Sequence, residues 1–484
     1  MTRGCHIPSR GTLATSIAIL LSLCALRTVA AEDPPAWPAA QTRLKNANAI
    51  AAQRGEPAAS AKIKDAAHRA KQLLAAGNAA AAEQAVRDAE AAAGLDAGGA
   101  TMSGIPVYHP TAAMAEQMTR LRADLDTALR AHDLPAVRRV IAQMRQVLGD
   151  QAGLPCLASF GKRAEPKPLE QRAVVDVFLA ALDNSKPVLG QVAAGRPVGD
   201  NPVRFYAELV AACCDVRPLV KRHRPDQLDH LDQLVLGACY VIAALQQPDG
   251  HMPSPDPNGK PDAKGRVHWL VSPAEDGGSQ FDTGEGGAAL LIASVTYAKP
   301  EWTASGLKAA DWAATQPCVR NFNYTACSVY LLAEAYRTTR NRKYLDAAVD
   351  KWELGLAPAQ LESGRWIDAH NARTAYHVLL LRAVTTLASL CPDNSPHRDA
   401  LRASSAQGVK SLIDEFSRLG VTNTGYALPV LLRQQKLDPS CDPRLALTID
   451  QTVAAVLSLC THDGRPHLAA SPASLVSAAH AAAE

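Results

Sequence analysis

The chain has 484 residues, with 50 Lys and Arg against 47 Asp and Glu, and a formal net charge of +3. This near balance argues against a nucleic-acid partner, which would need a basic face. Aromatic residues make up only 5% and alanine is abundant; because alanine has the highest helix propensity, the composition favours packed helices over sheets. The length allows a large core and more than one structural unit.

The N-terminal residues 1–31 are typical of a secretory signal peptide. Arg3 and Arg10 precede the apolar run "GTLATSIAILLSLCAL", and the small residues Val29 and Ala31 suit a cleavage site. The run is shorter than the roughly 20 residues that span a bilayer, although a single membrane anchor is the alternative. We therefore expect an exported protein, periplasmic or extracellular, with no integral membrane span after the signal is removed.

The chain contains 11 cysteines, two of which belong to the predicted signal. The odd number that remains leaves at least one free thiol. Cys213, Cys214, Cys239 and Cys327 lie in apolar helical runs, where a free cysteine acts as a small hydrophobic residue, so few disulfides are expected. Neither CxxC nor CxxCH occurs, and the sequence identifies no metal ligands and no cofactor.

The region 41–150 reads as a set of alanine-rich helices behind a linker at residues 32–40. Residues 41–95 are predicted to form two helices, and 111–148 a helical hairpin split at "AHDLP". The charged faces of these helices are typical of solvent-facing helices. We expect an accessory N-terminal helical bundle in which the sequence shows no chemistry.

From residue 165 to residue 484, two kinds of helical run alternate. One kind is amphipathic, such as "NRKYLDAAVDKW"; the other is apolar on nearly every side, such as "TAYHVLLLRAVTTLASLC". A helix that is apolar all round must be buried all round, whereas an amphipathic helix can cover it. Inner helices are expected to begin near Pro202, Gly284, Tyr324, Thr374, Thr424 and Ser471.

This alternation predicts an all-α fold: an (α/α) toroid of about six helical hairpins, preceded by the N-terminal helical bundle. A ring of five hairpins or an open horseshoe is the alternative. Such repeats bury a core only when several units stack.

In a ring of parallel inner helices, the N-terminal ends of these helices meet at one mouth. The segments that enter the predicted inner helices are rich in Asn, Asp and aromatic residues: "NPVRFYAE", "QFDTGEGGA", "RNFNYTA", "DAHNARTAYH" and "VTNTGYA". Unpaired N–H groups at helix N-termini suit anionic ligands. The long loop 249–282 is expected to cover the same mouth. We therefore predict a pocket there, although each Asp or Asn could instead be only a helix cap.

Catalytic candidates at this mouth are the acidic residues and the polar cluster that precedes one apolar helix: Asp282, Glu285, Asp368, His370, Asn371, Arg373, Tyr376 and His377. Substrate-binding candidates are the remaining polar and aromatic residues of the mouth and loop: Arg204, Tyr206, His268, Trp269, Asn323, Tyr324, Arg365, Trp366, Asn423 and Tyr426. The two tryptophans are expected to stack on sugar rings, with packing against the protein as the alternative. Glu334 and Arg382, at similar depth in two inner helices, are predicted to form a buried ion pair.

Two segments carry a family resemblance. "ALQQPDGHMP" (244–253) resembles the QxxDGxW-like turns that follow outer helices in terpenoid cyclases, prenyltransferases and family-10 pectate lyases, with His251 and Met252 replacing the usual Gly-Trp. "FNYTACSVYLLAEAYRTTRNRKYLDAA" (322–348) is similar to a segment of those lyases and of other toroid carbohydrate enzymes. The resemblance covers roughly residues 200–460. It implies the α/α-toroid (six-hairpin-like) superfamily of carbohydrate-active lyases and hydrolases, and a carbohydrate polymer or oligosaccharide as the partner.

A polysaccharide lyase would need groups that neutralise a uronate carboxylate and a base that takes the adjacent proton. Asn371, His370 and Arg373 are candidate neutralising groups. Tyr376 or His377 is the candidate base, the tyrosine only if positive charge lowers its pKa.

A glycoside hydrolase would instead need two carboxylates about 5–5.5 Å or 6.5–9.5 Å apart. Asp282, Glu285 and Asp368 are the candidates. A non-catalytic binding or scaffold protein of the cell envelope is the third possibility that the sequence leaves open.

Overall fold

The computed structural model describes residues 37–53, 57–94, 101–102, 105–156, 163–166, 170–184, 190, 194, 202–255, 269–270, 277–422, 426–462, 465–466 and 472–481. Every structural statement below concerns these residues. The predicted signal peptide at 1–31 lies outside them, as do His268 and Asn423.

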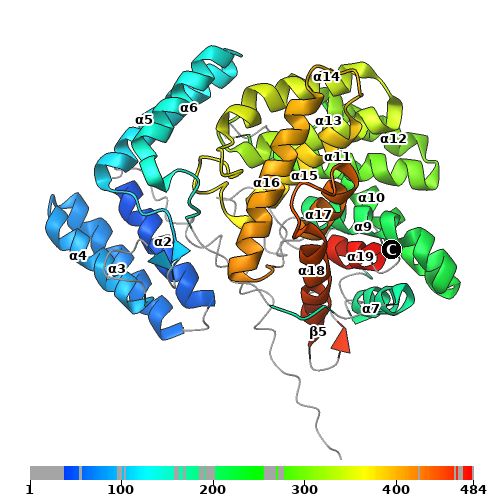
Figure 1. Cartoon of the computed structure of the whole chain (residues 1–484), viewed down its shortest axis with the longest axis horizontal. Helices are drawn as coiled ribbons and strands as arrows, with labels where there is room; N and C mark the ends of the chain where they lie inside the picture. Colours follow the sequence, from blue (N-terminus) through cyan, green and yellow to red (C-terminus); the bar gives the residue numbers. More distant parts are fainter. Residues whose placement is uncertain are drawn as a thin grey trace, which may run out of the picture.

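Six helices form the inner wall of a closed ring (Figure 1). They are α9 (Pro202–His223), α11 (Gly278–Tyr297), α13 (Phe322–Thr339), α15 (Thr374–Leu390), α17 (Ala427–Leu437) and α19 (Pro472–Ala481). Each inner helix packs against the next in this order, and α19 packs against α9. The predicted all-α toroid is therefore confirmed, and its closed, six-hairpin form is the one that occurs.

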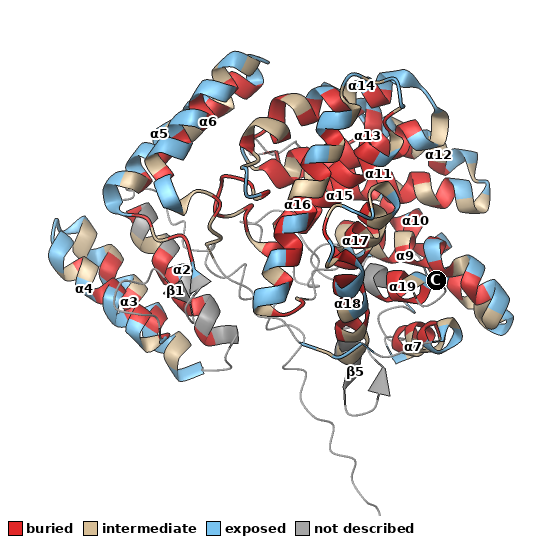
Figure 2. Ribbon diagram, in the orientation of Figure 1, coloured by how far each residue is buried: buried red, intermediate tan, exposed pale blue. Residues whose placement is uncertain are grey.

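Six outer helices cover the joints between inner helices. They are α10 (Leu228–Leu245), α12 (Pro300–Thr315), α14 (Arg342–Lys351), α16 (Arg398–Leu419), α18 (Leu445–Cys460) and α7 (Gln171–Asn184). The outer helix α7 comes first in the chain yet packs against α19 and α9, so it seals the joint between the last and first inner helices. Figure 2 shows that burial follows this division: the inner helices α11, α13 and α15 are buried on nearly every side, and the outer helices on one face.

Apart from the N-terminal helices, the rest of the described secondary structure is short. Three two-residue ladders pair Thr101–Met102 with Ile105–Pro106, Ser254–Pro255 with Trp269–Leu270, and Thr461–His462 with Arg465–Pro466. Single turns occur at Gly149–Gln151 (η1), Pro225–Gln227 (η2), Trp352–Leu356 (η3, a π-helical turn that continues α14) and Ala357–Ala359 (η4).

The QxxDGxW-like turn noted in the sequence occurs a second time, at Gln360–Trp366. In the first copy, the side-chain nitrogen of Gln246 donates to the carbonyls of Gly250 and Ser305, each at 2.9 Å, and the Ser305 hydroxyl donates back to the amide oxygen.

In the second copy, Gln360 donates to the carbonyls of Gly364 (3.2 Å) and Ser404 (3.0 Å), and the Ser404 hydroxyl donates to Gln360. Both glycines have positive φ, and a Cβ on either would meet a carbonyl of the next outer helix. Each turn therefore ties one outer helix to the next, which is a structural role.

The N-terminal helices lie to one side of the toroid (Figure 1). Residues 41–95 were expected to form two helices, but the chain forms three: α2 (Trp37–Gln53), α3 (Pro57–Ala75) and α4 (Ala79–Ala92). The helix α2 also takes in part of the predicted linker 32–40, because Trp37 is buried against α3 and α4. The predicted hairpin at 111–148 corresponds to α5 (Ala112–Arg130) and α6 (Leu134–Leu148).

The segment Pro225–Leu245, which is η2 with α10, is long and apolar enough to cross a membrane by length and composition. No such segment was expected beyond the signal. In the fold, α10 packs against α9 and α11 as an outer helix of the ring. The eight cysteines whose side chains are described, including Cys213, Cys214, Cys239 and Cys327, are all free thiols.

Candidate functional site

The N-terminal ends of the inner helices meet at one mouth, as specific contacts between them show. Arg204 of α9 binds Asp282 of α11 through Nε (2.7 Å) and Nη2 (3.1 Å), and its guanidinium lies 4.1 Å from the ring centre of Phe281. The Phe281 ring meets Tyr324 of α13 edge-on at 6.1 Å. The Arg204 side chain is 41% exposed whereas Asp282 is fully buried, so the arginine covers the acid from the solvent side.

Below this layer, a buried ion pair crosses the ring. Arg382 of α15 binds both carboxylate oxygens of Glu285 of α11, and its guanidinium lies between the rings of Tyr330 and Tyr426, 4.1 Å from each ring centre. Burial alone would lower the pKa of Arg382, but Glu285 outweighs it and the pKa lies well above its usual value. The predicted partner of Arg382 was Glu334, which is wrong, because Glu334 pairs with Arg337 one turn further along α13.

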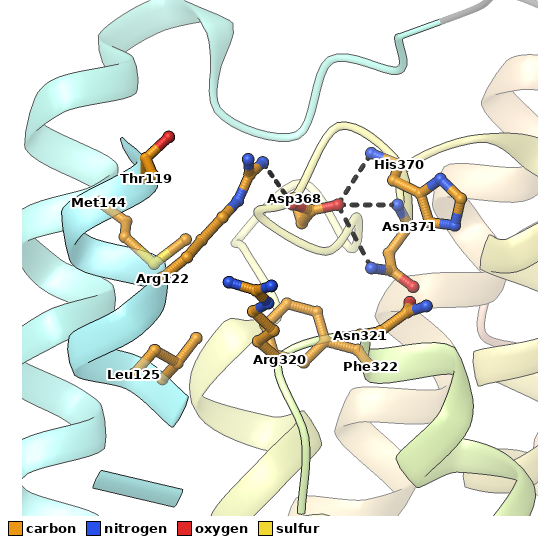
Figure 3. Close-up of a pocket in the computed structure, with 10 residues that line it drawn as sticks. All are labelled: Thr119, Arg122, Leu125, Met144, Arg320, Asn321, Phe322, Asp368, His370 and Asn371. Atoms are coloured by element: carbon orange, nitrogen blue, oxygen red, sulfur yellow. Dashed lines mark hydrogen bonds and ion pairs between the residues drawn. The ribbon is translucent and has the colours of Figure 1, made fainter. Parts of the chain in front are cut away.

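A cavity of about 430 Å³ lies between the α5–α6 hairpin and the rim of the toroid (Figure 3). Such a volume is within the range of small-ligand sites. The helices α5 and α6 line it with Thr119, Arg122, Leu125 and Met144; the toroid lines it with Arg320, Asn321, Phe322, Asp368, His370 and Asn371. The α5–α6 side therefore carries two polar and two apolar side chains, and the toroid side is mostly polar.

Asp368 organises the polar wall. Its Oδ1 accepts bonds from the backbone N–H groups of His370 (2.9 Å) and Asn371 (3.3 Å), and its Oδ2 accepts one from Arg122 of α5 at 2.9 Å. Burial alone would raise the pKa of Asp368, but the charges of Arg122 and His370 outweigh it, and the pKa lies below its usual value. Asp368 is thus a fixed anion that positions the loop before α15, residues 364–373, called the rim loop below.

Both the oxygen and the nitrogen of the Asn371 side-chain amide form hydrogen bonds within the protein. Its oxygen accepts bonds from the backbone N–H of Asn323 (3.1 Å) and from that residue's side chain (3.0 Å), while its nitrogen donates to Asp368 at 3.3 Å. Asn371 and Asn323 therefore join the rim loop to the start of α13. Neither is placed to neutralise a substrate carboxylate.

Two guanidinium groups and one carboxylate, that of Asp368, line the described part of the pocket. Arg122 and Arg320 line it, and each also pairs with one acid across the interface: Arg122 with Asp368, and Arg320 with Asp126 of α5 at 3.3 Å. The Arg122 side chain is 34% exposed and the Arg320 side chain 50%, so both guanidinium groups remain in contact with solvent. Such a surface attracts an anionic ligand.

His370 connects the pocket to an aromatic stack at its edge. The His370 ring lies on Tyr376 with ring centres 4.2 Å apart and planes at 27°, and Arg373 lies 5.3 Å from the Tyr376 ring centre. Burial lowers the pKa of His370 below 6.5; Asp368 opposes this, while Arg373 and Arg122 add to the lowering. His370 is therefore a neutral imidazole at neutral pH, able to accept a proton.

Two residues of the rim loop, Trp366 and Arg365, and one residue of α15, His377, have side chains that pack away from the pocket. Trp366 is fully buried and donates its indole N–H to the carbonyl of Leu356, and His377 packs against it and bonds Gly408 of α16. Arg365 binds Glu415 and Ser411, also of α16. These side chains fasten the loop to an outer helix, and the structure does not bring them to the pocket.

The remaining predicted residues have varied placements. Tyr206 is fully buried in the core. Tyr426 faces the buried Glu285–Arg382 pair. Trp269 lies in β4, where only its backbone is described. Within the described residues, no group of three or more His, Cys, Asp or Glu could hold a metal ion.

Seven of the lining residues were not among the predicted site residues: Thr119, Arg122, Leu125, Met144, Arg320, Asn321 and Phe322. Arg122 carried a usable signal. It lies at a core-facing position of the apolar stripe Ala115, Met118, Leu125, Leu129 on α5. A charged residue at such a position requires a partner on the surface against which the helix packs.

No protein-family model and no curated protein matches the sequence. Among solved structures, the chain is similar to a glycosyl hydrolase of family 88 from Bacteroides vulgatus, at 8% identity and a TM-score of 0.44 over 65% of this chain and 99% of that one. It is also similar to a polysaccharide lyase, at 10% identity and a TM-score of 0.41 over 64% and 96% of the two chains.

A metagenome-derived glycoside hydrolase family 9 endoglucanase matches at 15% identity with a TM-score of 0.36, over 51% of this chain. The match spans only 52% of that endoglucanase. Likenesses at these identities and TM-scores say nothing about the activity of this chain, so the site has to be interpreted from its own residues.

Proposed function

We propose that this protein is an exported carbohydrate-active enzyme that cleaves an acidic polysaccharide by β-elimination in the pocket between α5 and the rim of the toroid. The observation that carries the proposal is that Arg122, Arg320 and His370, a histidine whose pKa is lowered by burial, line one cavity. Guanidinium groups bind and neutralise a uronate carboxylate, and a neutral imidazole accepts the adjacent proton.

The state of the acids at the mouth favours elimination over hydrolysis. A glycosidase needs one carboxylic acid that gives a proton to the leaving oxygen and a second carboxylate as nucleophile or base. Here Asp282 is bound by Arg204, Glu285 by Arg382, and Asp368 by Arg122. Acids held as anions in ion pairs are poor proton donors, and the pKa of Asp368 is lowered.

The proposed reaction follows from these placements. The carboxylate of a uronate residue binds Arg122 and Arg320, which withdraws charge from C5 and acidifies its proton. His370 takes that proton, the electron pair forms the C4–C5 double bond, and the C4–O bond to the preceding sugar breaks. The leaving oxygen takes a proton from water, and His370 then loses its proton to solvent.

In the proposed reaction, two residues have roles that differ from those in the sequence hypothesis. His370, expected there as a neutralising group, becomes the base. Tyr376, a candidate base there, stacks on the imidazole and orients it. His377, the other candidate base, is fully buried in the contact with α16.

The test is incubation of the protein with pectate, alginate and other uronic-acid polymers, followed by the absorbance of the unsaturated uronide product. The His370→Ala variant is expected to lose about 10²- to 10⁴-fold in turnover, the usual size of a general-base contribution. Absence of unsaturated product from every polymer, with the protein shown to be folded, would remove the lyase proposal. Uronide binding without any product would favour the non-catalytic envelope protein.

A further inference from the structure

The α5–α6 hairpin closes one side of the pocket and is fixed to the toroid at several points. Along α5, Arg122 pairs with Asp368 and Asp126 pairs with Arg320. On α6, Arg145 donates to the carbonyls of Pro358 (3.3 Å) and Gln360 (2.9 Å).

Behind the hairpin, the segment after α6 continues this closure. The backbone N–H groups of Gly153 and Cys156 donate to the carbonyls of Ile367 and Ala369, at 3.4 and 3.0 Å. The acceptor residues Ile367 and Ala369 flank Asp368 in the rim loop. The pocket wall is thus bonded to the toroid on both sides of the residue that organises the site.

The exposure of the lining residues shows which way the cavity opens. Leu125, Met144 and Phe322 are each only 1% exposed and form the apolar floor. Thr119 and Arg320 are exposed and mark the rim. A ligand that enters past these two residues therefore meets an apolar inner end among the described residues.

We infer that the pocket receives the reducing-end residue of an acidic polysaccharide and releases it one unit at a time, an inference that rests on the proposed function. The residue that loses its C5 proton to His370 carries the rest of the chain on its O4. That chain must leave through the opening, so the O1 side faces the apolar floor formed by Leu125, Met144 and Phe322. A further sugar on O1 would have to pass through the wall built by α5 and α6.

The test uses hexauronides of galacturonate and of alginate sugars that carry ¹³C at the anomeric carbon of the reducing-end residue. Each first cleavage is expected to place the label in an unsaturated monouronide, identified by mass spectrometry at early times. Label that first appears in larger unsaturated products would overturn the chain-end inference and leave the lyase proposal intact.

If no substrate is cleaved, binding separates the two proposals. Uronide chains of increasing length are titrated with the His370→Ala variant, in which chains survive, and the number of proteins bound per chain is measured. One protein per chain at every length supports recognition of a chain end even though the lyase proposal has failed. A number that grows with chain length, or no binding to any uronide, overturns the inference.

A variant pair tests whether the wall sets this mode. Arg145→Ala removes the two bonds from α6 to the toroid without touching the pocket lining, and is expected to raise the fraction of labelled products larger than one unit at least several-fold. Arg138→Ala, an exposed arginine on the same helix, is the matched control and should leave the product pattern unchanged. Identical patterns for both variants would contradict the role assigned to the wall.

Discussion

At the scale of single residues, arginine decides what the acids of the mouth can do. Arg204, Arg382 and Arg122 each bind one candidate carboxylate, and His370 is the lining residue to which the proposal gives the role of base. The chemistry of the site therefore depends on the protonation of one histidine, whose neighbours are charged groups of both signs.

The pH profile of the reaction should report this arrangement. Because burial lowers the pKa of His370 below 6.5, activity should rise with pH through a limb centred below 6.5 and then stay level. Arg373→Gln removes a charge that lowers this pKa, so the limb should move to higher pH; Asp368→Asn removes a charge that raises it, so the limb should move to lower pH. Profiles of kcat/KM for the three proteins check these signs, and shifts in one common direction would contradict the assignment.

The sequence identified the rim loop as part of a pocket but could not divide its residues between pocket and packing. His370 and His377 differ by only seven positions in a polar cluster, yet His370 is a lining residue of the cavity and the His377 ring packs on α16. The direction of a side chain at a helix entry depends on the neighbouring helix, and nothing local in the sequence specifies it. Arg122 was missed for the related reason that its partner is 246 residues away.

At the scale of elements, the chain uses a repeated device to set each outer helix. The turns at Gln246–Gly250 and Gln360–Gly364 make the same hydrogen bonds to a serine of the next outer helix. The first turn resembles a family motif, whereas the second copy has Ser363 in place of the Asp and was not predicted. Helix starts were better predicted: Pro202 and Thr374 are correct, and Tyr324 lies two residues inside α13.

Removal of either glutamine should destabilise the fold. Gln246→Ala and Gln360→Ala each leave buried carbonyls without their donor, and each is expected to lower the free energy of unfolding by about 1–3 kcal/mol. Gln233→Ala, an exposed residue on α10, is the control and should change it by less than about 0.5 kcal/mol. Chemical denaturation of the three variants gives these values; equal effects at all three positions would show that the turns contribute nothing special.

At the scale of the whole molecule, polar contacts hold distant helices in one ring. The Glu285–Arg382 pair joins α11 to α15 and reaches Tyr330 of α13 and Tyr426, the residue that precedes α17. The contacts of α5 with Asp368 and Arg320 join the N-terminal helices to the same mouth. The predicted toroid gave the number of inner helices, but these cross-ring partners depend on the register of the helices, which hydrophobic pattern alone does not determine.

Breaking the cross-ring pair should be costly. Arg382→Met leaves the Glu285 carboxylate buried without its cation and is expected to lower the free energy of unfolding by about 3–5 kcal/mol. The double variant Glu285→Leu with Arg382→Met, which removes both charges, should recover most of that loss. The exposed pair Arg342–Asp346 is the control, since loss of Asp346 should cost under about 1 kcal/mol. A double variant no more stable than the single one would contradict this account of the pair.

The docking of α5 should depend on pH. Because the folded pKa of Asp368 lies below its usual value near 3.9, its pairing stabilises the protein fully above about pH 4 and is lost as pH falls through the folded pKa. Asp368→Asn should therefore lower stability at pH 7 by about 1–3 kcal/mol and have less effect at pH 3. Thermal unfolding at the two pH values tests this, and a constant difference between them would contradict it.

The seal made by α7 has a consequence for how the chain reaches its native state. One wall of the final joint is among the first parts of the toroid to be synthesised, and the other, α19, is among the last. Closure therefore waits for contacts of very long sequence separation, which are slow to form. Until α19 has been synthesised, the ring cannot close, and the apolar faces that α19 covers on α9 and α7 stay exposed. Under the export proposed above, this delay would keep the chain unfolded while it crosses the membrane.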